Sequence, residues 1–254
     1  MRAVVVGASS GLGRCIGIGL AQRGTQVALL ARRRNRLDAA AREAGSGTLA
    51  IECDASDPVS CRTAIAAAAT GLGGIDALVY APGIGPIGRV VDTDVATWRS
   101  VFDTNVTGAA LITAAAIDHL TDSSGVAVYL SSVSASLTPP WPGLGAYAVS
   151  KAALDKLVES LRTEHPSVGF TRLVVGDCAG GEGDGRTEFA NSWDPAVAAE
   201  FGTVWLSRGL LSGSMIEVDH LVAVVDSVLR AGASISIPSI TVAPRPAADP
   251  AVRA

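Results

Sequence analysis

The sequence predicts an α/β fold, namely a doubly wound three-layer sandwich built on a seven-stranded parallel sheet. Seven short apolar runs rich in β-branched residues recur along the chain, and alanine-rich amphipathic stretches lie between them. Of the 254 residues, 48% are hydrophobic but only 4% are aromatic, a composition typical of close-packed helices on a sheet. Strands that are apolar at consecutive positions must be buried on both faces, and crossover helices cover both faces of a parallel sheet.

Each run has the length and composition of one element. The expected strands are AVVVG, QVALLA, TLAIECD, DALVYA, VAVYLSS, FTRLVVG and SISIPSITVA, at residues 3–7, 26–31, 48–54, 76–81, 126–132, 170–176 and 234–243. The expected helices are amphipathic and occupy residues 12–23, 33–44, 57–71, 93–104, 107–120, 145–163 and 217–231.

Two segments interrupt this alternation. TPPWPG at 138–143 contains three prolines, and DCAGGEGDGR at 177–186 is rich in glycine and acid, which is typical of a mobile loop or lid. We expect one nucleotide-binding domain over residues 1–245 that includes the active site, followed by a frayed proline-rich tail at 246–254.

Composition argues against several functional classes. The net charge is −4 without a basic stripe, so we expect neither nucleic-acid nor membrane partners, and no apolar run is long enough to suggest a span. The four cysteines form no C-x-x-C pair, and the three histidines have no ligand partners at metal spacing, so we expect no metal site. The first residues enter a strand without an apolar leader, and we expect a soluble cytoplasmic protein.

A glycine-rich turn joins the first strand to the first helix. In VVVGASSGLGR, the glycines at 7, 11 and 13 permit a tight turn and allow backbone N–H groups to approach a phosphate. The following helix N-terminus offers free donors and a favourable dipole for a pyrophosphate. The spacing is G-x-x-x-G-x-G rather than G-x-G-x-x-G, so other parts of the sequence are needed to identify the turn as a dinucleotide site.

The end of the second strand predicts which cofactor binds. In dinucleotide folds this position holds an acid for a free ribose 2′-hydroxyl or an arginine for a 2′-phosphate. Here it holds Arg32 and Arg33. Guanidinium groups are suited to phosphate, whereas a carboxylate would repel it. The sequence therefore favours NADP(H) over NAD(H), with Arg32 as the preferred phosphate ligand.

Tyr147 and Lys151 lie four residues apart on a predicted helix, in GAYAVSKAAL, so they share a face. A free tyrosine has a pKa of about 10, and a nearby ammonium would lower it toward the range of a general acid or base. The chain has 20 basic residues, of which only Lys151 and Lys156 are lysines. Lysine at position 151 is therefore notable, since it provides a compact ammonium.

Six motifs in register resemble the short-chain dehydrogenase/reductase family, whose members have a single-domain Rossmann fold with a Tyr-x-x-x-Lys motif. The motifs are the glycine turn, CDASD (53–57), YAPG (80–83), DTNVTG (103–108), YLSSVSA (129–135) and YAVSK (147–151). The similarity spans roughly residues 3 to 190. Relatives in this family usually form dimers or tetramers, so the resemblance implies a homodimer or homotetramer through the helices near 107–120 and 145–163.

The resemblance also implies roles for individual residues. Tyr147 would exchange a proton with the substrate oxygen, and Lys151 would lower its pKa and hold the nicotinamide ribose. Ser132 would orient the substrate carbonyl, and Asn105 would help to hold a proton-relay water. The remaining implied cofactor contacts are Gly7, Ser9, Ser10, Gly11, Leu12, Gly13, Arg32, Arg33, Asp54, Ala55, Ala81 and Gly83.

Several residues depart from the family pattern. Ser132 lies fifteen residues before Tyr147 rather than thirteen, a count that lands on Ser134; we favour Ser132, because the proline-rich loop could absorb an insertion. The family's NNAG is YAPG here, and Gly176 and Asp177 replace a Pro-Gly pair, which leaves Thr187 as a candidate nicotinamide contact. Trp141 either stacks on a ring substrate or packs as an aromatic lid.

The predicted function is interconversion of a small-molecule carbonyl and alcohol by hydride transfer from or to NADP(H), with Tyr147 as general acid or base. An alternative is a non-catalytic nucleotide-sensing protein on the same fold, motivated by the altered YAPG and the missing Pro-Gly. A third possibility, an epimerase or dehydratase, is less favoured, because such enzymes usually add a larger C-terminal substrate domain.

Overall fold

The computed structural model describes residues 1–211 and 213–245; the expected tail at 246–254 lies outside the described residues. Seven strands form one parallel sheet in the order β3-β2-β1-β4-β5-β6-β7, which confirms the predicted doubly wound fold. The strands are β1 (Arg2–Val6), β2 (Gln26–Ala31), β3 (Leu49–Glu52), β4 (Ala77–Tyr80), β5 (Val126–Ser132), β6 (Gly169–Val175) and β7 (Ser239–Val242).

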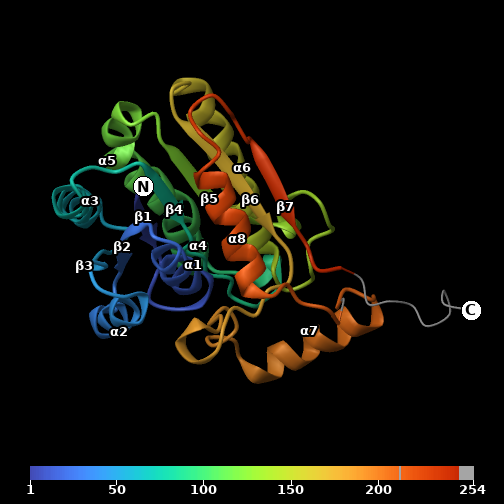
Figure 1. The fold of residues 1–254 in the computed structure, drawn as a ribbon. Helices are drawn as coiled ribbons and strands as arrows, with labels where there is room; N and C mark the ends of the chain where they lie inside the picture. The colour runs from blue at the N-terminus through green and yellow to red at the C-terminus, as the bar shows by residue number, and fades with distance from the viewer. Residues whose placement is uncertain (212, 246–254) are drawn as a thin grey trace, which may run out of the picture.

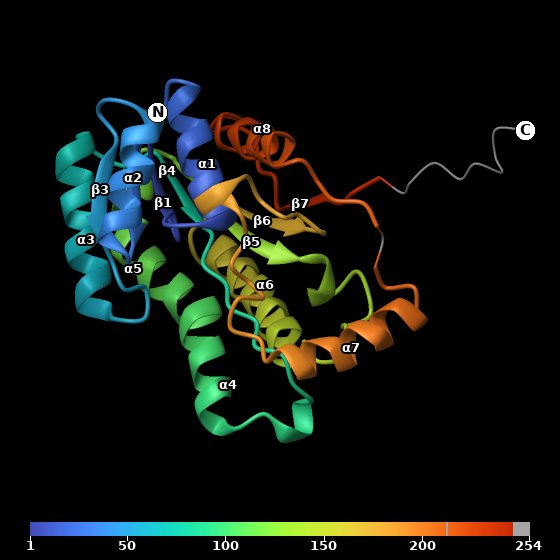
Figure 2. The same ribbon diagram turned by 90° about the horizontal axis from the view of Figure 1, so that it is seen from below.

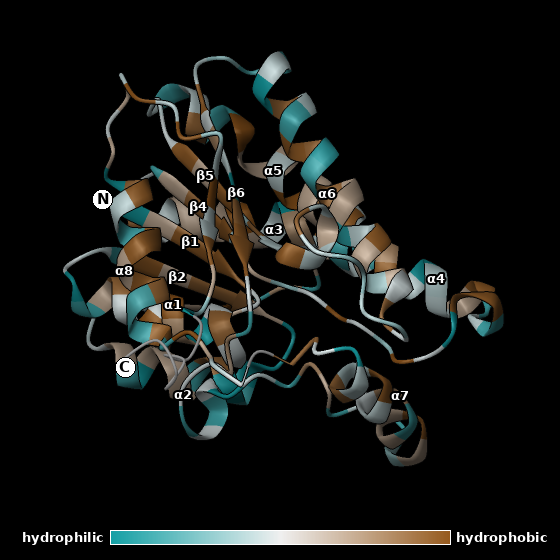
Figure 3. Cartoon of the chain, turned by 90° about the vertical axis from the view of Figure 1, so that its right-hand side faces the viewer, coloured by the Kyte–Doolittle hydropathy of each residue, from teal (hydrophilic) through white to brown (hydrophobic). Residues whose placement is uncertain are grey.

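The helices form a layer on each face of the sheet (Figures 1 and 2). One layer consists of α1 (Gly11–Gln22), α2 (Arg34–Ala44) and α8 (Val218–Leu229), and the other contains α3 (Pro58–Leu72), α5 (Gly108–Asp122) and α6 (Gly145–Glu164). Alternate residues of each strand enter opposite cores: Val5 belongs to the first layer, and Val4 and Val6 belong to the second. Figure 3 shows the apolar sheet between these helices.

The strand order reverses between β1 and β4, which pair in parallel with Val4 opposite Leu78. Ligands of open α/β sheets bind at such a point, outside the carboxyl ends of the strands. The two loops that leave β1 and β4 there carry Gly7 and Pro82, and a Cβ added to Gly7 would lie 2.9 Å from the Pro82 nitrogen. The fold therefore opens a crevice where the sequence places the glycine-rich turn.

The chain between 93 and 122 differs from its prediction. Instead of two separate helices, α4 (Val95–Phe102) and α5 are joined by a π-helical turn at Asp103–Thr107. By length and composition alone, the stretch Val95–Asp122 could also cross a membrane. Its α5 half, however, places Ile112, Ala116 and Leu120 in the core against the sheet, as in a globular protein.

The helix α7 (Pro195–Ser207) is absent from the prediction. Asp194 caps it by accepting hydrogen bonds from the Ala196 and Val197 N–H groups, and Pro195 occupies its first turn. Its apolar face packs with Leu144 in a small third core, which lies apart from the sheet beside the two irregular segments. The last predicted strand is also shorter than expected, since only residues 239–242 pair with β6.

Candidate active site

The glycine-rich turn has the backbone that its sequence predicts. Gly7 and Gly11 have φ of +81° and +57°, values that L side chains rarely adopt. A Cβ added to Gly13 would lie 2.5 Å from the Gly7 carbonyl oxygen, so the first helical turn passes directly against β1. Ser10 precedes α1 without capping it through its side chain, so its hydroxyl satisfies none of the N–H groups of the first turn.

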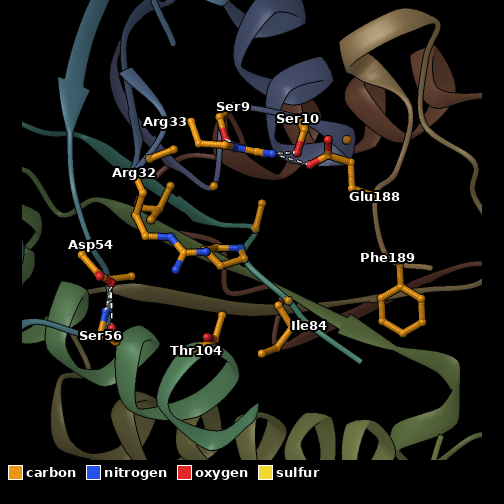
Figure 4. Close-up of a pocket in the computed structure, with 18 of the residues that line it drawn as sticks. Ser9, Ser10, Arg32, Arg33, Asp54, Ser56, Ile84, Thr104, Glu188 and Phe189 are labelled. Atoms are coloured by element: carbon orange, nitrogen blue, oxygen red, sulfur yellow. Dashed lines mark hydrogen bonds and ion pairs between the residues drawn. The ribbon is translucent and has the colours of Figure 1, made fainter. Parts of the chain in front are cut away.

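A cavity of about 300 Å³ extends from this turn toward the ends of β2 and β3 (Figure 4). Arg32 extends across it, whereas Arg33 turns toward the glycine-rich turn and donates to the hydroxyls of Ser9 and Ser10 at 2.9 and 2.6 Å. The predicted cofactor residues that line this cavity are Gly7, Ser9, Ser10, Gly11, Arg32, Arg33, Asp54, Ala55, Ala81 and Gly83.

The Asp54 carboxylate is held in place at the far end of this cavity. It accepts hydrogen bonds from the Ser56 hydroxyl at 2.7 Å and the Ser56 N–H at 3.0 Å, and these bonds lower the pKa of Asp54. Cys53 and Ala55 flank it on the cavity wall. Asp54 therefore forms part of the wall of the first cavity.

A second cavity of about 320 Å³ adjoins the first, because Ala81, Gly83, Thr187 and Phe189 line both. Apolar groups dominate this cavity. Its lining includes the predicted residues Leu12, Ser132, Ser134, Trp141, Tyr147 and Lys151. The structure thus brings most of the predicted cofactor residues, together with Ser132, Tyr147 and Lys151, to one continuous crevice at the carboxyl edge of the sheet, whereas Gly13 and Asn105 line neither cavity.

Tyr147 and Lys151 face the second cavity from the first turns of α6. The Lys151 ammonium donates to the Leu130 carbonyl oxygen at 2.7 Å and lies 5.8 Å from the centre of the Tyr147 ring. Burial lowers the pKa of Lys151 to about 8, an effect that the charge of Asp155 partly offsets. The ammonium is therefore much more readily deprotonated than a lysine in water.

The sequence-based expectation that Lys151 lowers the pKa of Tyr147 is wrong. Burial raises the pKa of Tyr147, and a hydrogen bond with Ser132 lowers it only in part. The reason is that desolvation disfavours the phenolate, while the ammonium is held at the Leu130 carbonyl. Lys151 would therefore lower the pKa of Tyr147 only in a site that is more polar or that holds more water.

The two candidate serines lie at the end of β5 and share a hydrogen bond between hydroxyls at 3.0 Å. Only Ser132 lowers the pKa of Tyr147 by hydrogen bonding, while its oxygen also accepts from the Ser134 N–H at 3.2 Å. This geometry favours Ser132 as the partner of Tyr147, with Ser134 behind it.

Asn105 lies in the π-helical turn and is fully buried. Its side-chain amide donates to the Ile84 carbonyl at 2.9 Å and to the Ser150 hydroxyl at 2.8 Å, and its oxygen accepts from the Ile84 N–H. Both side-chain donors are therefore used within the protein. Asn105 joins the loop after β4 to α6. A proton-relay water would therefore have to accept a hydrogen bond from a donor other than Asn105.

Tyr80 explains how the chain tolerates YAPG. Its ring is fully buried, and its hydroxyl donates to the Thr104 carbonyl at 2.5 Å, inside the π-helical turn. A Cβ added to Gly108 would lie 2.5 Å from this hydroxyl, so the helix passes close above it. Tyr80 thus holds the turn that carries Asn105, a role that sequence comparison with NNAG does not predict.

Apart from Thr187, the sequence did not predict the segment Thr187–Trp193, here called the covering segment, which crosses both cavities. Glu188 pairs with Arg33 at 2.6 Å and with Arg36, and Phe189 packs edge-on against Tyr147 with ring centroids 4.8 Å apart. Trp193 donates its indole N–H to the Gly85 carbonyl at 2.7 Å. The preceding segment, 177–186, was predicted as a lid, but no sequence signal marked these contacts.

Trp141 and Thr187 are the remaining predicted site residues, and both line a cavity. Trp141 lines the second cavity and packs against Trp205 of α7, with centroids 5.2 Å apart. Thr187 lines both cavities. Among residues 1–211 and 213–245, no group of three or more His, Cys, Asp or Glu side chains could hold a metal ion.

Comparisons with known proteins agree with this geometry. Residues 1–180 match the family described as short chain dehydrogenase. The Arabidopsis thaliana protein named 11-beta-hydroxysteroid dehydrogenase 1A is 37% identical over 166 residues, covering 63% of this chain and 47% of that protein. The chain therefore spans about half the length of that relative.

Two solved structures share the fold over nearly the whole chain. The alcohol dehydrogenase from Thermococcus sibiricus complexed with 5-hydroxy-NADP has a TM-score of 0.79 and 23% identity, and 94% of each chain is covered. The 3-ketoacyl-(acyl-carrier-protein) reductase from Brucella melitensis complexed with NADH has a TM-score of 0.80 and 22% identity, covering 95% of this chain and 96% of that one.

Proposed function

Because the chain belongs to the short-chain dehydrogenase family, we propose that it is an oxidoreductase that interconverts a carbonyl and an alcohol with NADP(H), using Tyr147 as general acid or base. One observation carries the proposal. Tyr147, Lys151 and Ser132 line a single cavity that is continuous with the crevice beside the glycine-rich turn. A substrate carbonyl at Tyr147 would thus lie next to a dinucleotide in that crevice.

The crevice fits a dinucleotide phosphate. Close backbone packing requires glycine at positions 7 and 13, and α1 begins at the cavity with its first N–H groups uncapped by the Ser10 side chain. Arg32 extends into the cavity and, among the described residues, forms no ion pair. This availability supports Arg32 as the ligand for a 2′-phosphate, and hence NADP(H) over NAD(H).

The cofactor, when bound, supplies or accepts the hydride. The chain would orient the substrate and move the proton: the Ser132 hydroxyl donates to the carbonyl oxygen, and Tyr147 delivers a proton to the same oxygen in reduction. The raised pKa of Tyr147 keeps the phenol protonated at neutral pH, as a proton donor must be. Lys151 would hold the cofactor ribose and stabilise the phenolate left after transfer.

The second cavity supports a substrate class. Leu12, Trp141, Phe189 and Trp193 contribute apolar and aromatic surface, and the charged side chains on its wall are Lys151 and Asp177. Such a lining favours neutral, ring-containing carbonyl compounds over anionic ones. The name of the Arabidopsis relative points in the same direction, and we propose this class for the first assays.

The alternative, a nucleotide-sensing protein without catalysis, rested on the altered YAPG and the missing Pro-Gly. The first no longer supports it, because Tyr80 has a structural role at Thr104 that accounts for the altered YAPG. We also propose, as the resemblance implies, a cytoplasmic homodimer or homotetramer formed through α5 and α6, with the active site and cofactor site in one domain. Light scattering on the purified protein would measure the assembly.

The function is tested by following NADPH oxidation with a panel of ring ketones and aldehydes. We expect turnover by the wild-type protein and a loss of about a hundredfold or more in Tyr147→Phe, because general acid catalysis contributes about 10²–10⁴-fold. Tyr129→Phe is the matched control, since Tyr129 is also a hydrogen-bonded tyrosine but is fully buried and bonds to Thr113, away from both cavities. Equal rates for wild type and Tyr147→Phe on every active compound would contradict the proposal.

A further inference from the structure

Glu188 is an acidic side chain beside the glycine-rich turn, at the end of the crevice where we propose that the phosphate groups of the cofactor bind. It lies in the covering segment, more than 150 residues along the chain from the arginines of the β2–α2 turn. Its two carboxylate oxygens bind different partners, with Oε2 2.6 Å from Arg33 Nη1 and Oε1 beside Arg36 Nη1. Figure 4 shows it next to Ser10 at the rim of the cavity.

The carboxylate occupies donors that suit a phosphate. Arg33 and Ser10 face Glu188, and Arg33 is itself held across the Ser9 and Ser10 hydroxyls of the glycine-rich turn. These donors lie within the cavity that carries Arg32. Carboxylate and phosphate bind guanidinium groups in the same way, so the two anions would compete for Arg33 and Arg36.

Glu188 is ionised at any pH near neutrality. The ion pair with Arg36, reinforced by Arg33, lowers the pKa of Glu188 to about 2. A dinucleotide 2′-phosphate would therefore enter beside a full negative charge, while a free 2′-hydroxyl would meet an acceptor for its hydrogen. Each effect favours the cofactor that lacks the phosphate.

We propose that Glu188 is a specificity-determining residue for the cofactor: by occupying Arg33 and Arg36 it weakens the binding of 2′-phosphorylated dinucleotides and leaves Arg32 as the main contact for that phosphate. This inference rests on the proposed dinucleotide site. Glu188 thus moderates the preference for NADP(H) that Arg32 and Arg33 would otherwise produce. A residue that only fastened the covering segment would affect both cofactors equally.

The test is to titrate the full chain with NADPH and NADH by calorimetry and to compare the ratio of their Kd values in wild type and Glu188→Gln. We expect the ratio to shift toward NADPH by about tenfold, because the uncharged amide leaves the guanidinium groups of Arg33 and Arg36 to bind the phosphate. Glu200→Gln is the matched control, because Glu200 also pairs with an arginine, Arg89 at 2.7 Å, but lines neither cavity.

Adenosine fragments separate the phosphate end from the catalytic end. We expect 2′,5′-ADP to bind Glu188→Gln more tightly than it binds wild type, and 5′-AMP to bind both proteins alike or to prefer wild type. These fragments do not extend to Tyr147, so movement of Phe189 cannot produce the difference. Glu188→Ala should give the same shift, and circular dichroism checks that each variant is folded.

The outcomes distinguish this inference from the proposed function. Wild-type protein that binds neither dinucleotide would overturn the proposed function. Wild-type protein that binds NADPH, with an unchanged Kd ratio in Glu188→Gln or with both cofactors weakened equally, would overturn the inference alone. A shift toward NADH in Glu188→Gln would also overturn it.

Discussion

The Phe189 ring lies edge-on to the Tyr147 ring, with centroids 4.8 Å apart and an interplanar angle of 68°. A Cβ added to Gly85 would lie within 2.4 Å of two Phe189 atoms and 3.2 Å from Tyr147 Cγ, so the three residues are closely packed. Phe189 therefore contributes to the burial of the Tyr147 side chain, and burial is the main cause of the raised Tyr147 pKa.

Phe189→Ala should lower the pKa of Tyr147 by admitting water to the phenol. Reduction requires the protonated phenol, so its rate falls as the pH rises through this pKa. We expect the alkaline limb of kcat/KM for carbonyl reduction to move to lower pH in Phe189→Ala, by about one unit, which corresponds to about 1.4 kcal/mol. Phe102→Ala, on α4 away from both cavities, is the control. An unmoved limb would show that Phe189 does not control this burial.

Lys151 should make stability rise with pH in a defined window. Its folded pKa of about 8 lies below the ordinary lysine value of 10.5 because of burial. Between these values the unfolded chain binds the proton and the folded chain does not, so the free energy of unfolding increases with pH. Below pH 8 both states are protonated, and the buried charge is a constant penalty.

The comparison with Lys151→Met isolates this effect. We expect the free energy of unfolding of wild type minus that of Lys151→Met to rise by about 2–3 kcal/mol between pH 7.5 and 10.5 in urea titrations. Lys156→Met is the control, since Lys156 is exposed and pairs only with Glu159. A difference that stayed flat or fell over this range would mean that Lys151 is not desolvated in the folded protein.

Tyr80→Phe should weaken both the fold and the reaction. The buried Thr104 carbonyl would lose its hydrogen bond, which costs about 1–3 kcal/mol, and the π-helical turn around Asn105 would loosen. We expect a lower Tm and a reduced kcat. Tyr129→Phe, which loses the bond to Thr113, should lower Tm while leaving kcat close to that of wild type. Equal kcat values for the two variants would argue against coupling between Tyr80 and the site.

Gly13→Ala should weaken dinucleotide binding more than it weakens helix formation. The new methyl group would lie 2.5 Å from the Gly7 carbonyl, which must move and distort the turn. We expect NADPH to bind at least about tenfold more weakly, or 1.4 kcal/mol. A Cβ added to Gly202 in α7 would meet nothing within 4 Å, which makes Gly202→Ala the control. This variant should bind NADPH like wild type and should be more stable by up to about 1 kcal/mol. Unchanged binding in Gly13→Ala would contradict the phosphate role of the turn.

The strands, the glycine-rich turn and the positions of Tyr147 and Lys151 could be predicted because local patterns determine them. Runs such as Val4–Val6 can be stable only inside a covered sheet, and the four-residue spacing on α6 fixes a shared face. The helix α7 could have been found from the same kind of signal, since Asp194 and Pro195 form a cap and Val197, Phe201 and Trp205 recur at helical spacing.

The rest depends on contacts between distant parts of the chain. Glu188 meets Arg33 across 155 positions of sequence, and Phe189 meets Tyr147 only after the covering segment has crossed the crevice. The error over the Tyr147 pKa has the same origin. Spacing places an ammonium nearby, but it does not show that the Leu130 carbonyl holds it or that an aromatic ring keeps water away.

The π-helical turn at Asp103–Thr107 adds one residue to an otherwise α-helical stretch. Each residue advances an α-helix by about 100°, so this single addition sets the rotation between the side of α4 that buries Val101 and the side of α5 that buries Ile112. Deleting one of the residues that flank Asn105 in this turn would change that rotation by about 100° and should turn Asn105 away from Ser150. The rotation that the extra residue introduces along the helix therefore matters as much as the identity of Asn105 for joining the loop after β4 to α6.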